Sequence, residues 1–563
     1  MNASVSVALA GSGGAGVMTA GNMLLEAAAQ AGYYGLMTRT SGPQIRGGEA
    51  AAMLRVSTFA TDGQDDRFQV LAAIDWQNVA RFAAELPLGP ASLIVGDPAQ
   101  GEPPEVFLRG GARYFPVPLK KISAQIPGGW PNMVALGVLA GLIGLPFEAL
   151  EAAARKAMKK GLEAGIAAAR AGMSQAASLS KDFVLEKAPG KSARWLITGN
   201  EAAGYGALRG GVRFVAAYPI TPATELLEWL SPALAKIGGT LVQAEDELAS
   251  INMALGASYG GVPALTATSG PGLALMIESL GLGVAAEVPV VVVDVMRTGP
   301  STGIATKSEQ ADLNIALYGM HGDAPHIVVA PNSVADCLAA TEWAVGLAES
   351  LQVPAIVLSD QYFGQARAVV DVPSKKDFSL SRMTSEEKDN YRRYALTPSG
   401  VSPMAIPGTP GCAYTADGLE HNEKGTPSSQ AADHLAQMDK RARKVSELDP
   451  GDAWASIEGE GDVAILTFGS CTGPAREAIL RNNEKVRLVS LRLLSPPQPE
   501  RLKRALEGVK QVLVLEQNHS GQFLRYLRAE YDLPCKMTSL RRPGPLPFRP
   551  GEISQNLLKL KTP

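Results

Sequence analysis

Two glycine-rich segments near the start of the chain could bind phosphate. The first, Gly11-Ser12-Gly13-Gly14-Ala15-Gly16, lies between an apolar strand and a helix, where backbone N–H groups and the helix dipole favour an anion. The second, Ser41 to Gly48, contains Arg46, whose guanidinium can bind an anion. A nicotinamide site would also need an acidic residue about 20 positions onward, and Tyr34 to Thr40 contains none. A purely structural turn and a site for another phosphate-bearing ligand remain as alternatives.

The segment Tyr218-Pro219-Ile220-Thr221-Pro222-Ala223-Thr224 is the most informative in the chain. It follows an apolar strand, and its two prolines favour an extended backbone that points Thr221 away from a rigid loop. Pro222 suits the first turn of a helix over 223–230, with Thr221 as its cap. A capped helix with no further function is the simplest interpretation of this pattern alone.

The elements that must position these segments alternate along the chain. A strand over 5–10 and a helix over 24–30 open it, and a helical stretch over 150–168 follows. Val290 to Val293 is apolar on both faces, as in a central parallel strand. Charged helical turns are expected over 385–393, within a proline-rich region. Together with the remaining strands and helices, this pattern predicts an α/β fold of three Rossmann-like, doubly wound parallel sheets. The other expected strands are 212–217, 240–244, 264–268, 288–295, 355–358, 463–468, 486–491 and 512–515, with a helix over 475–481.

Composition excludes several classes of protein. With 52 basic and 55 acidic side chains, the net charge of −3 gives no electrostatic footprint for nucleic acid or an anionic membrane. No secretory signal is visible, and Met133 to Leu145 falls short of the ~20 apolar residues of a membrane span, so it predicts a buried helix. The four cysteines form no C-x-x-C pair and the five histidines no H-x-x-x-H pair, so we expect no metal site within this chain. We expect a cytoplasmic protein.

Several motifs occur in an order that resembles the 2-oxoacid:ferredoxin oxidoreductases. Tyr218 to Thr224 is similar to the signature of their thiamine-diphosphate pyrimidine-binding domain, and Thr268-Ser269-Gly270-Pro271-Gly272 follows in the expected place. Arg297 to Gly303, with Glu309 to Leu313, looks like the 2-oxoglutarate branch of the family. The N-terminal glycine turn with Arg46 resembles the gamma domain, and Glu516-Gln517-Asn518 resembles part of the transketolase-like third domain.

The resemblance covers nearly the whole chain and implies four parts. They are a gamma-type domain related to coenzyme A over 1–185, a pyrimidine-binding domain over 192–372, a long loop or linker over 373–455, and a transketolase C-terminal-like domain over 456–563.

The resemblance also implies roles for individual residues. In thiamine enzymes a carboxylate in a largely apolar pocket shares a proton with the pyrimidine ring. Glu247 fits this role and Glu245 is its rival, and the spacing to Gly256-Ala257 favours Glu247. The alternative is that the trio Glu245-Asp246-Glu247 only complements a helix N-terminus.

Arg297 would orient the substrate carboxylate, unless it forms only a surface ion pair, and Thr221 would donate a hydrogen bond to the substrate. Further expected contacts to the cofactor come from Tyr218, Pro219, Ile220, Thr221, Ser269 and Gly270. Those to coenzyme A or a second carboxylate come from Arg46, Gly13, Gly14 and Lys307.

Some parts of the family's site are missing from this sequence. Every Gly-Asp pair fails at the third residue of Gly-Asp-Gly, the motif that holds Mg²⁺ and the diphosphate, and cysteines at cluster spacing are absent. We therefore expect a beta subunit to carry the diphosphate site, Mg²⁺ and a [4Fe-4S] cluster, in an α2β2 complex that reduces ferredoxin.

The resulting hypothesis is the fused gamma–alpha subunit of a 2-oxoglutarate:ferredoxin oxidoreductase. The complex would convert 2-oxoglutarate and coenzyme A to succinyl-CoA and CO2, or run in reverse in a reductive carbon-fixing cycle. A relative that acts on branched-chain or aryl 2-oxoacids is the nearest alternative. A nicotinamide-dependent dehydrogenase and a non-catalytic assembly or coenzyme A-binding subunit are the alternatives from other classes.

Overall fold

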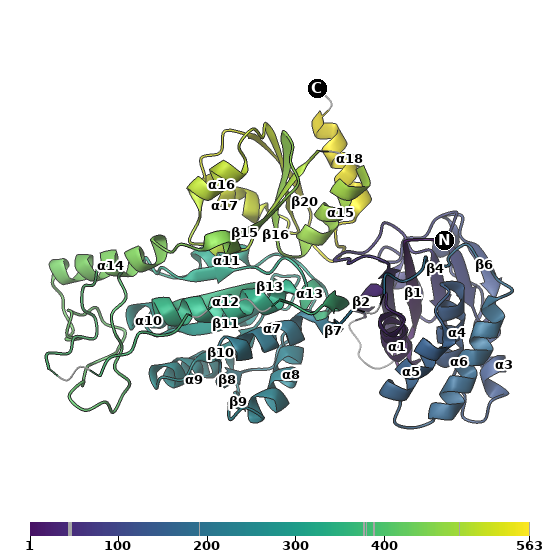
Figure 1. Cartoon of the computed structure of the whole chain (residues 1–563), viewed down its shortest axis with the longest axis horizontal. Coiled ribbons are helices and arrows are strands. Elements are labelled where there is room, and N and C mark those ends of the chain that lie inside the picture. The colour runs from purple at the N-terminus through teal and green to yellow at the C-terminus, as the bar shows by residue number, and fades with distance from the viewer. Residues whose placement is uncertain are drawn as a thin grey trace. The chain divides into compact units, whose positions relative to one another are not determined.

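The computed structural model describes residues 1–42, 48–190, 192–374, 378, 380–386, 389–482 and 485–561. The chain divides into two compact units (Figure 1). The first unit comprises residues 1–198, 365–374 and 548–555, and the second comprises the rest.

The first unit is built on an eight-stranded sheet in the order β6-β5-β4-β1-β3-β2-β14-β7. Strands β4, β5 and β6 run parallel to β1, whereas β3, β2, β14 and β7 pair antiparallel in succession. The α/β class is confirmed, but this sheet is mixed rather than parallel, because a short connection joins β2 to β3 and such a connection permits only antiparallel pairing. The strands are β1 (Ser4–Ser12), β2 (Tyr34–Ser41), β3 (Glu49–Ser57), β4 (Val70–Ala73), β5 (Leu93–Gly96), β6 (Arg113–Pro116), β7 (Arg194–Thr198) and β14 (Arg367–Asp371).

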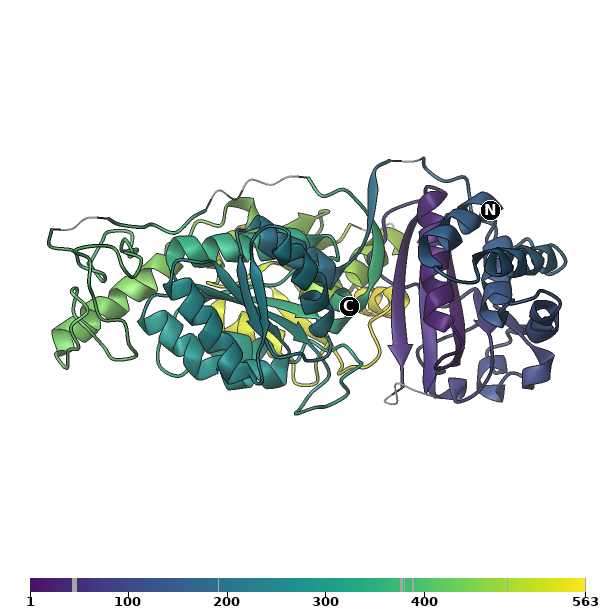
Figure 2. The same ribbon diagram turned by 90° about the horizontal axis from the view of Figure 1, so that it is seen from below.

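Side chains alternate between two cores on the faces of this sheet. Val5, Val7 and Leu9 of β1 join the core that helices cover, whereas Ala8 and Ala10 join a second core on the opposite face. Figure 2 shows the first helix beside the purple strands. The helices of the unit are α1 (Val17–Gln30), α2 (Glu105–Leu108), α3 (Leu119–Ala124), α4 (Pro131–Leu142), α5 (Phe147–Ala157) and α6 (Leu162–Ala176), with short 3-10 turns at Val79–Phe82 and Pro98–Gln100.

Two sequence predictions for these helices have different outcomes. The buried helix expected over 133–145 is confirmed as α4, nearly all of whose residues are buried. The single helical stretch expected over 150–168 is wrong. The helix is interrupted between α5 and α6, where Gly161 adopts a φ of 65°. A left-handed backbone of this kind favours glycine and interrupts a helix.

The second unit contains a seven-stranded sheet in the order β18-β12-β13-β11-β10-β8-β9. All neighbouring strands are parallel except the pair of β12 with β18. The strands are β8 (Phe214–Ala217), β9 (Thr240–Gln243), β10 (Ala264–Thr268), β11 (Val290–Met296), β12 (Ile327–Val329), β13 (Pro354–Asp360) and β18 (Leu493–Ser495). The helices are α7 (Gly199–Arg209), α8 (Thr224–Ala235), α9 (Glu247–Tyr259), α10 (Gly270–Ala285), α11 (Leu313–Tyr318), α12 (Asp336–Leu351) and α13 (Gln361–Gln365).

A five-stranded sheet in the order β15-β17-β16-β19-β20 forms the C-terminal part of the second unit. Only β15 is antiparallel to its neighbour. The strands of this sheet are β15 (Ala455–Glu458), β16 (Val463–Phe468), β17 (Arg487–Leu491), β19 (Gln511–Glu516) and β20 (Lys536–Arg541). The helices of this region are α15 (Thr472–Asn482), α16 (Pro499–Ala505) and α17 (Gln522–Glu530), with 3-10 turns at Gly451–Trp454 and Gly469–Cys471. The last helix, α18 (Pro550–Lys561), begins in the first unit and ends in the second.

The region between these two sheets, residues 378–450 where described, contains the helix α14 (Ala431–Ser446) and otherwise irregular chain. The helical turns expected over 385–393 are wrong, because no helix forms in the described residues of that stretch. Arg393 there instead donates to the main-chain oxygen of Glu287 at 2.7 Å, and Tyr394 donates its backbone N–H to Glu423.

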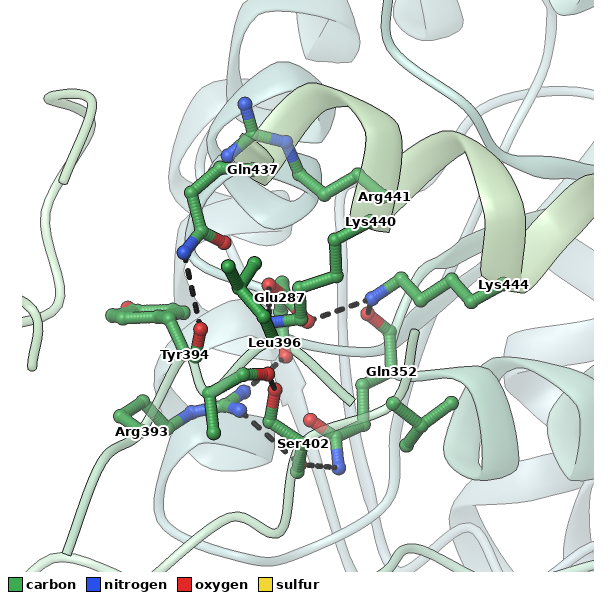
Figure 3. A network of polar contacts seen from close by, with 12 residues as sticks. Glu287, Gln352, Arg393, Tyr394, Leu396, Ser402, Gln437, Lys440, Arg441 and Lys444 are labelled. Carbon is green, nitrogen blue, oxygen red and sulfur yellow. Dashed lines mark hydrogen bonds and ion pairs between the residues drawn. The ribbon is translucent and has the colours of Figure 1, made fainter. Parts of the chain in front are cut away.

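A buried cluster of charged side chains joins α14 to the domain that contains the seven-stranded sheet (Figure 3). Lys440 and Lys444, one turn apart on α14, reach the two carboxylate oxygens of Glu287 at 2.7 and 2.9 Å, and all three side chains are fully buried. Burial alone raises the pKa of Glu287, but the charges of Lys444, Lys440 and Arg393 hold it far below its usual range. Burial lowers the pKa of Lys440 to about 8. The irregular region is therefore anchored to the fold at this point.

Candidate active site

Most of the residues singled out in the sequence lie at one edge of the seven-stranded sheet. Strands β8, β10 and β11 are parallel, so the segments that follow them, at Tyr218, Ser269 and Arg297, share the carboxyl edge. Glu247 follows β9, the next parallel strand. In open α/β sheets this edge is where ligands bind.

Glu247 is the buried member of the acidic trio. It is the first residue of α9 and is 7% exposed, whereas Glu245 and Asp246 are exposed. Asp246 is the helix cap, since its Oδ1 accepts the backbone N–H of Ala249 at 2.6 Å. The helix N-terminus is thus complemented by Asp246, and Glu247 is turned inward.

A glycine in the first turn of α10 makes room for the Glu247 carboxylate. A Cβ atom added at Gly272 would lie 2.7 Å from Oε1 of Glu247 and would overlap Oγ1 of Thr268. The first turn of α10 and the carboxylate of Glu247 are therefore in direct contact, and only a hydrogen atom fits between them.

Thr221 lies in an exposed loop whose backbone is held from two sides. Its carbonyl oxygen accepts Nη1 of Arg297 at 2.7 Å, and the next carbonyl, of Pro222, accepts Nδ2 of Asn200 at 2.9 Å. The expectation that Thr221 caps a helix over 223–230 is wrong. Helix α8 begins at Thr224 with Ala223 as its cap residue and no side-chain cap, because its first backbone bond runs from Thr224 N to Ile220 O. Tyr218 is 39% exposed beside it, and Pro219 and Ile220 are half-buried.

Arg297 is 7% exposed and lies directly after β11. Burial lowers the pKa of its guanidinium and the negative charge of Asp312 raises it. A buried guanidinium that donates to a backbone carbonyl does not match the expected alternative of a surface ion pair. Lys307 is half-buried in the loop that follows, where its carbonyl oxygen accepts the backbone N–H of Thr298 at 2.9 Å.

Three carboxyl groups near Arg297 were not singled out as site residues from the sequence. Asp294 lies within β11, and Glu309 and Asp312 flank the segment before α11. Burial raises the pKa of all three, that of Asp312 to about 7. Asp294 could have been noticed as a charge that follows four valines in a buried strand, a position where an ionised carboxylate is costly.

Ser269 and Gly270 begin α10 at the same edge. Ser269 is the cap residue and is fully buried, and Gly270 lies against the carboxylate of Asp312. The backbone N–H of Gly270 donates to that carboxylate.

In the first unit, the glycine turn between β1 and α1 lines a cavity of about 390 Å³. Gly13, Gly14, Ser41 and Glu49 are among its lining residues, and Gly14 and Gly16 have φ values of 96° and 83°. Several donors of the turn are used within the chain: Ser12 N donates to Asp75, Gly13 N to Gly48 O, and Ala15 N to Ser12 O. Arg46 lies outside the described residues.

The described part of the chain contains neither a metal-ligand cluster nor a helix that could span a membrane. No group of three or more histidine, cysteine, aspartate or glutamate side chains there could hold a metal ion. The four cysteines are separately buried as free thiols. Every helix in the same residues is too short or too polar to cross a membrane.

Two segments of the chain match known protein families. Residues 205–440 match the family described as "Pyruvate flavodoxin/ferredoxin oxidoreductase, thiamine diP-bdg", and residues 6–175 match "Pyruvate ferredoxin/flavodoxin oxidoreductase". The first match contains the loop with Thr221, the helix start with Glu247 and the strand end with Arg297.

Similar proteins extend these matches to the whole chain. The chain is 30% identical to the "2-oxoacid:ferredoxin oxidoreductase 2, subunit alpha" of Aeropyrum pernix, with 93% of each chain aligned. It is 32% identical to the "2-oxoglutarate synthase subunit KorA" of Methanothermobacter marburgensis, over 65% of this chain and 99% of that relative. Among solved structures, it resembles the 2-oxoglutarate:ferredoxin oxidoreductase from Magnetococcus marinus with 2-oxoglutarate, coenzyme A and succinyl-CoA bound, with a TM-score of 0.91 and 36% identity over 99% of this chain and 100% of that chain.

Proposed function

Because this chain belongs to the 2-oxoacid:ferredoxin oxidoreductase family and is similar to its alpha subunits, we propose that it is the fused gamma–alpha subunit of a 2-oxoglutarate:ferredoxin oxidoreductase. The observation that carries the proposal is the buried carboxylate of Glu247, which lies at the carboxyl edge of the matching domain against the first turn of α10. The overall reaction is 2-oxoglutarate, coenzyme A and oxidised ferredoxin to succinyl-CoA, CO2 and reduced ferredoxin, in either direction.

The residues present fit the pyrimidine half of thiamine diphosphate. Glu247 is a buried acid with an apolar helix behind it, and low dielectric strengthens a hydrogen bond to a ring nitrogen. The hydroxyl of Ser269 is buried without a hydrogen-bond partner in the described structure, so it is a further polar group for this site. Tyr218, Pro219, Ile220 and Gly270 complete the expected contacts. When bound, the cofactor would supply the nucleophilic carbon that adds to the carbonyl of a 2-oxoacid and the electron sink that loss of its carboxylate as CO2 requires.

The chain's own residues bind and orient the 2-oxoacid in this proposal. Arg297 is positioned by its hydrogen bond to the carbonyl of Thr221, and its remaining N–H groups bind the substrate carboxylate. The hydroxyl of the exposed Thr221 donates to an oxygen of the substrate. Lys307, in the loop that begins with Arg297, binds the second carboxylate of 2-oxoglutarate.

A partner subunit supplies what this chain lacks. The sequence has no Gly-Asp-Gly motif for Mg²⁺ and diphosphate, and no cysteine set for a [4Fe-4S] cluster. Helices α9 and α10, which meet at Glu247, carry three large exposed apolar side chains, Leu248, Met253 and Leu275, each between 44% and 50% exposed. Such a surface beside an incomplete site suits a partner that completes it. We therefore propose that the beta subunit packs here in an α2β2 complex and passes electrons to ferredoxin.

Coenzyme A is assigned to the glycine turn of the first unit. A cavity of about 390 Å³ at the N-terminus of a 14-residue helix suits one phosphate-bearing end of that molecule, with Gly13 and Gly14 in its lining. Arg46 is assigned to the same ligand from the sequence alone.

The test compares Glu247→Gln with Glu245→Gln in the complex assembled with the partner subunit. Exchange of the C2 proton of bound thiamine diphosphate is measured without ferredoxin or coenzyme A, and cofactor affinity is measured by calorimetry. The amide keeps the shape of the acid but cannot share its proton, so Glu247→Gln should slow exchange by ~10²–10⁴-fold with little loss of affinity. The exposed Glu245 should tolerate the same change. Normal exchange in both variants would refute the thiamine assignment for this chain.

A further inference from the structure

A group of buried carboxyl side chains lies behind Arg297, and the proposed reaction does not use it. Asp294 is fully buried within β11, and Glu309 is 6% exposed. In the described structure no hydrogen-bond partner faces either carboxylate oxygen of Asp294, Oε2 of Glu309 or Oδ2 of Asp312, although these atoms are buried. An ionised carboxylate that is buried without a partner costs free energy, so a cluster of such groups suggests a functional role.

Asp312 lies against the start of α10, and its charge acts on the guanidinium of Arg297. Its carboxylate covers Gly270, the first residue of α10, so closely that a Cβ atom there would collide with it. The backbone N–H of Gly270 donates to this carboxylate, at the end of a helix where negative charge is favoured. The charges of Asp312 and Arg297 act on each other's pKa, which places them within electrostatic reach.

The C-terminal domain fixes the segment that carries Asp312. Gln310 is fully buried, and its side chain donates to Phe468 O at 2.8 Å and accepts the backbone N–H of Gln517 at 2.9 Å. Its own backbone N–H donates to Gln517 O at 2.8 Å. On the other side of Asp312, Gln522 accepts Asn314 N at 2.9 Å and donates to Ala311 O at 2.8 Å. Asp312 therefore lies on a segment whose backbone is fixed on both sides, which holds it at the start of α10.

The charge of Asp312 responds to its neighbours near neutral pH. Burial and the negative charge of Glu309 raise its pKa, Arg297 and the Gly270 N–H lower it, and the result is about 7. The facing groups are Asp294 of β11, Arg297 after that strand, Glu309 on its own segment and the N-terminus of α10. Burial and then the charge of Asp312 raise the pKa of Asp294 well above its usual range, which favours the neutral form of Asp294.

Resting on the proposed function, in which Arg297 binds the substrate carboxylate, we propose that Asp312 is a positioning residue that acts through Arg297 and sets the charge this guanidinium presents to the 2-oxoacid. When Asp312 is neutral, the full positive charge of Arg297 is available to the substrate. When Asp312 is ionised, two anions share one cation and substrate binding weakens. Gln310 keeps Asp312 at this place, which gives the C-terminal domain a part in substrate binding.

The experiment measures KM and kcat for 2-oxoglutarate between pH 6 and pH 8.5 in the complex with the partner subunit. In the wild-type complex KM should rise several-fold as pH increases through about 7. In Asp312→Asn, KM should keep its low-pH value throughout, with kcat close to wild type at each pH. Coincident KM profiles in the two complexes would overturn the proposal.

A second variant keeps the proposal open to refutation if Asp312→Asn fails to assemble. Glu309→Gln removes a negative charge that raises the pKa of Asp312, so the midpoint of the KM rise should move to lower pH. An unmoved midpoint would contradict the proposal. A change confined to thermal stability or kcat in either variant would likewise assign these residues a structural role only.

Arg297→Lys separates this proposal from the proposed function on which it rests. An ammonium cannot form the two parallel bonds of a guanidinium, so this variant should raise KM for 2-oxoglutarate by roughly 10- to 150-fold. If it does so while wild type and Asp312→Asn behave alike, only the role of Asp312 is wrong. If KM does not change, Arg297 does not bind the substrate. The role proposed for Arg297 is then wrong, whatever the result for Asp312.

Discussion

Gly272 is the position at which a single added methyl group should disable Glu247. In Gly272→Ala the new Cβ atom would lie 2.7 Å from Oε1 of Glu247, whereas ordinary contact begins at 3.4 Å. The carboxylate must therefore move by about 0.7 Å, the difference between these two distances, or α10 must shift. The same Cβ atom would also overlap Oγ1 of Thr268, so α10 cannot relieve the contact by moving toward β10.

The expected size of the effect of Gly272→Ala combines two opposing contributions to stability with one to the rate of exchange. Alanine favours a helix over glycine by about 1 kcal/mol, and overpacking costs about 1–3 kcal/mol, so the net loss of stability should be about 0–2 kcal/mol. A misplacement approaching 1 Å of a reacting group can cost ~10²-fold in rate. We expect the variant to fold and assemble with C2 proton exchange of the cofactor slowed by roughly 10²-fold.

Gly256→Ala is the matched control, because that glycine also lies in a helix and its added Cβ would meet no atom within 4 Å. It should be as stable as wild type or more stable by about 1 kcal/mol, with normal exchange. Stability is measured by denaturant unfolding and exchange by NMR in the assembled complex. Wild-type exchange in a folded Gly272→Ala complex would refute the contact between Glu247 and α10 as the feature that positions the acid.

Two further predictions concern other parts of the chain. Glu287→Gln leaves Lys440 and Lys444 buried without their carboxylate, which should lower the free energy of unfolding by about 3–5 kcal/mol, whereas Glu460→Gln, at a surface pair with Lys485, should change it by less than about 1 kcal/mol. Equal losses in denaturant unfolding would contradict the anchoring role of the Glu287 cluster. Arg46→Ala should raise the concentration of coenzyme A needed for half-maximal rate and leave decarboxylation without coenzyme A largely intact; an unchanged requirement would remove this residue from the coenzyme A site.

The sequence predicted the second sheet and its carboxyl edge well, because the information is local. The run Val290 to Val293 is apolar on both faces and forms part of β11, and Arg297 follows the strand as expected. The strand over 264–268 and that over 463–468 are confirmed with the same bounds. Burial of Glu247 agrees with an acid in an apolar pocket, while its catalytic role stays a prediction.

Features that depend on distant pairing could not be predicted. Nothing near Lys440 or Lys444 in the sequence indicates that Glu287, more than 150 residues earlier, neutralises them. That Asp246 is the member of the acidic trio that caps α9 could not be predicted either, because any of three adjacent acids can complement a helix N-terminus. Asp312 escaped notice as a site residue because its surroundings come from β11, α10 and the C-terminal domain together.

The last two strands of the first sheet flank a large insertion, since β7 ends at Thr198 and β14 begins at Arg367. A fragment ending near residue 190, between the first two parts expected from the sequence, would lose both strands and leave the edge of β2 without its partner β14. Exposed edges of this kind pair with other chains and aggregate. The protein should therefore tolerate separation of its N-terminal part poorly unless residues 192–198 and 365–374 are returned to it, for example by joining them through a short turn. The first unit is thus not a continuous N-terminal segment, because its sheet includes a strand that the chain reaches only after residues 199–364.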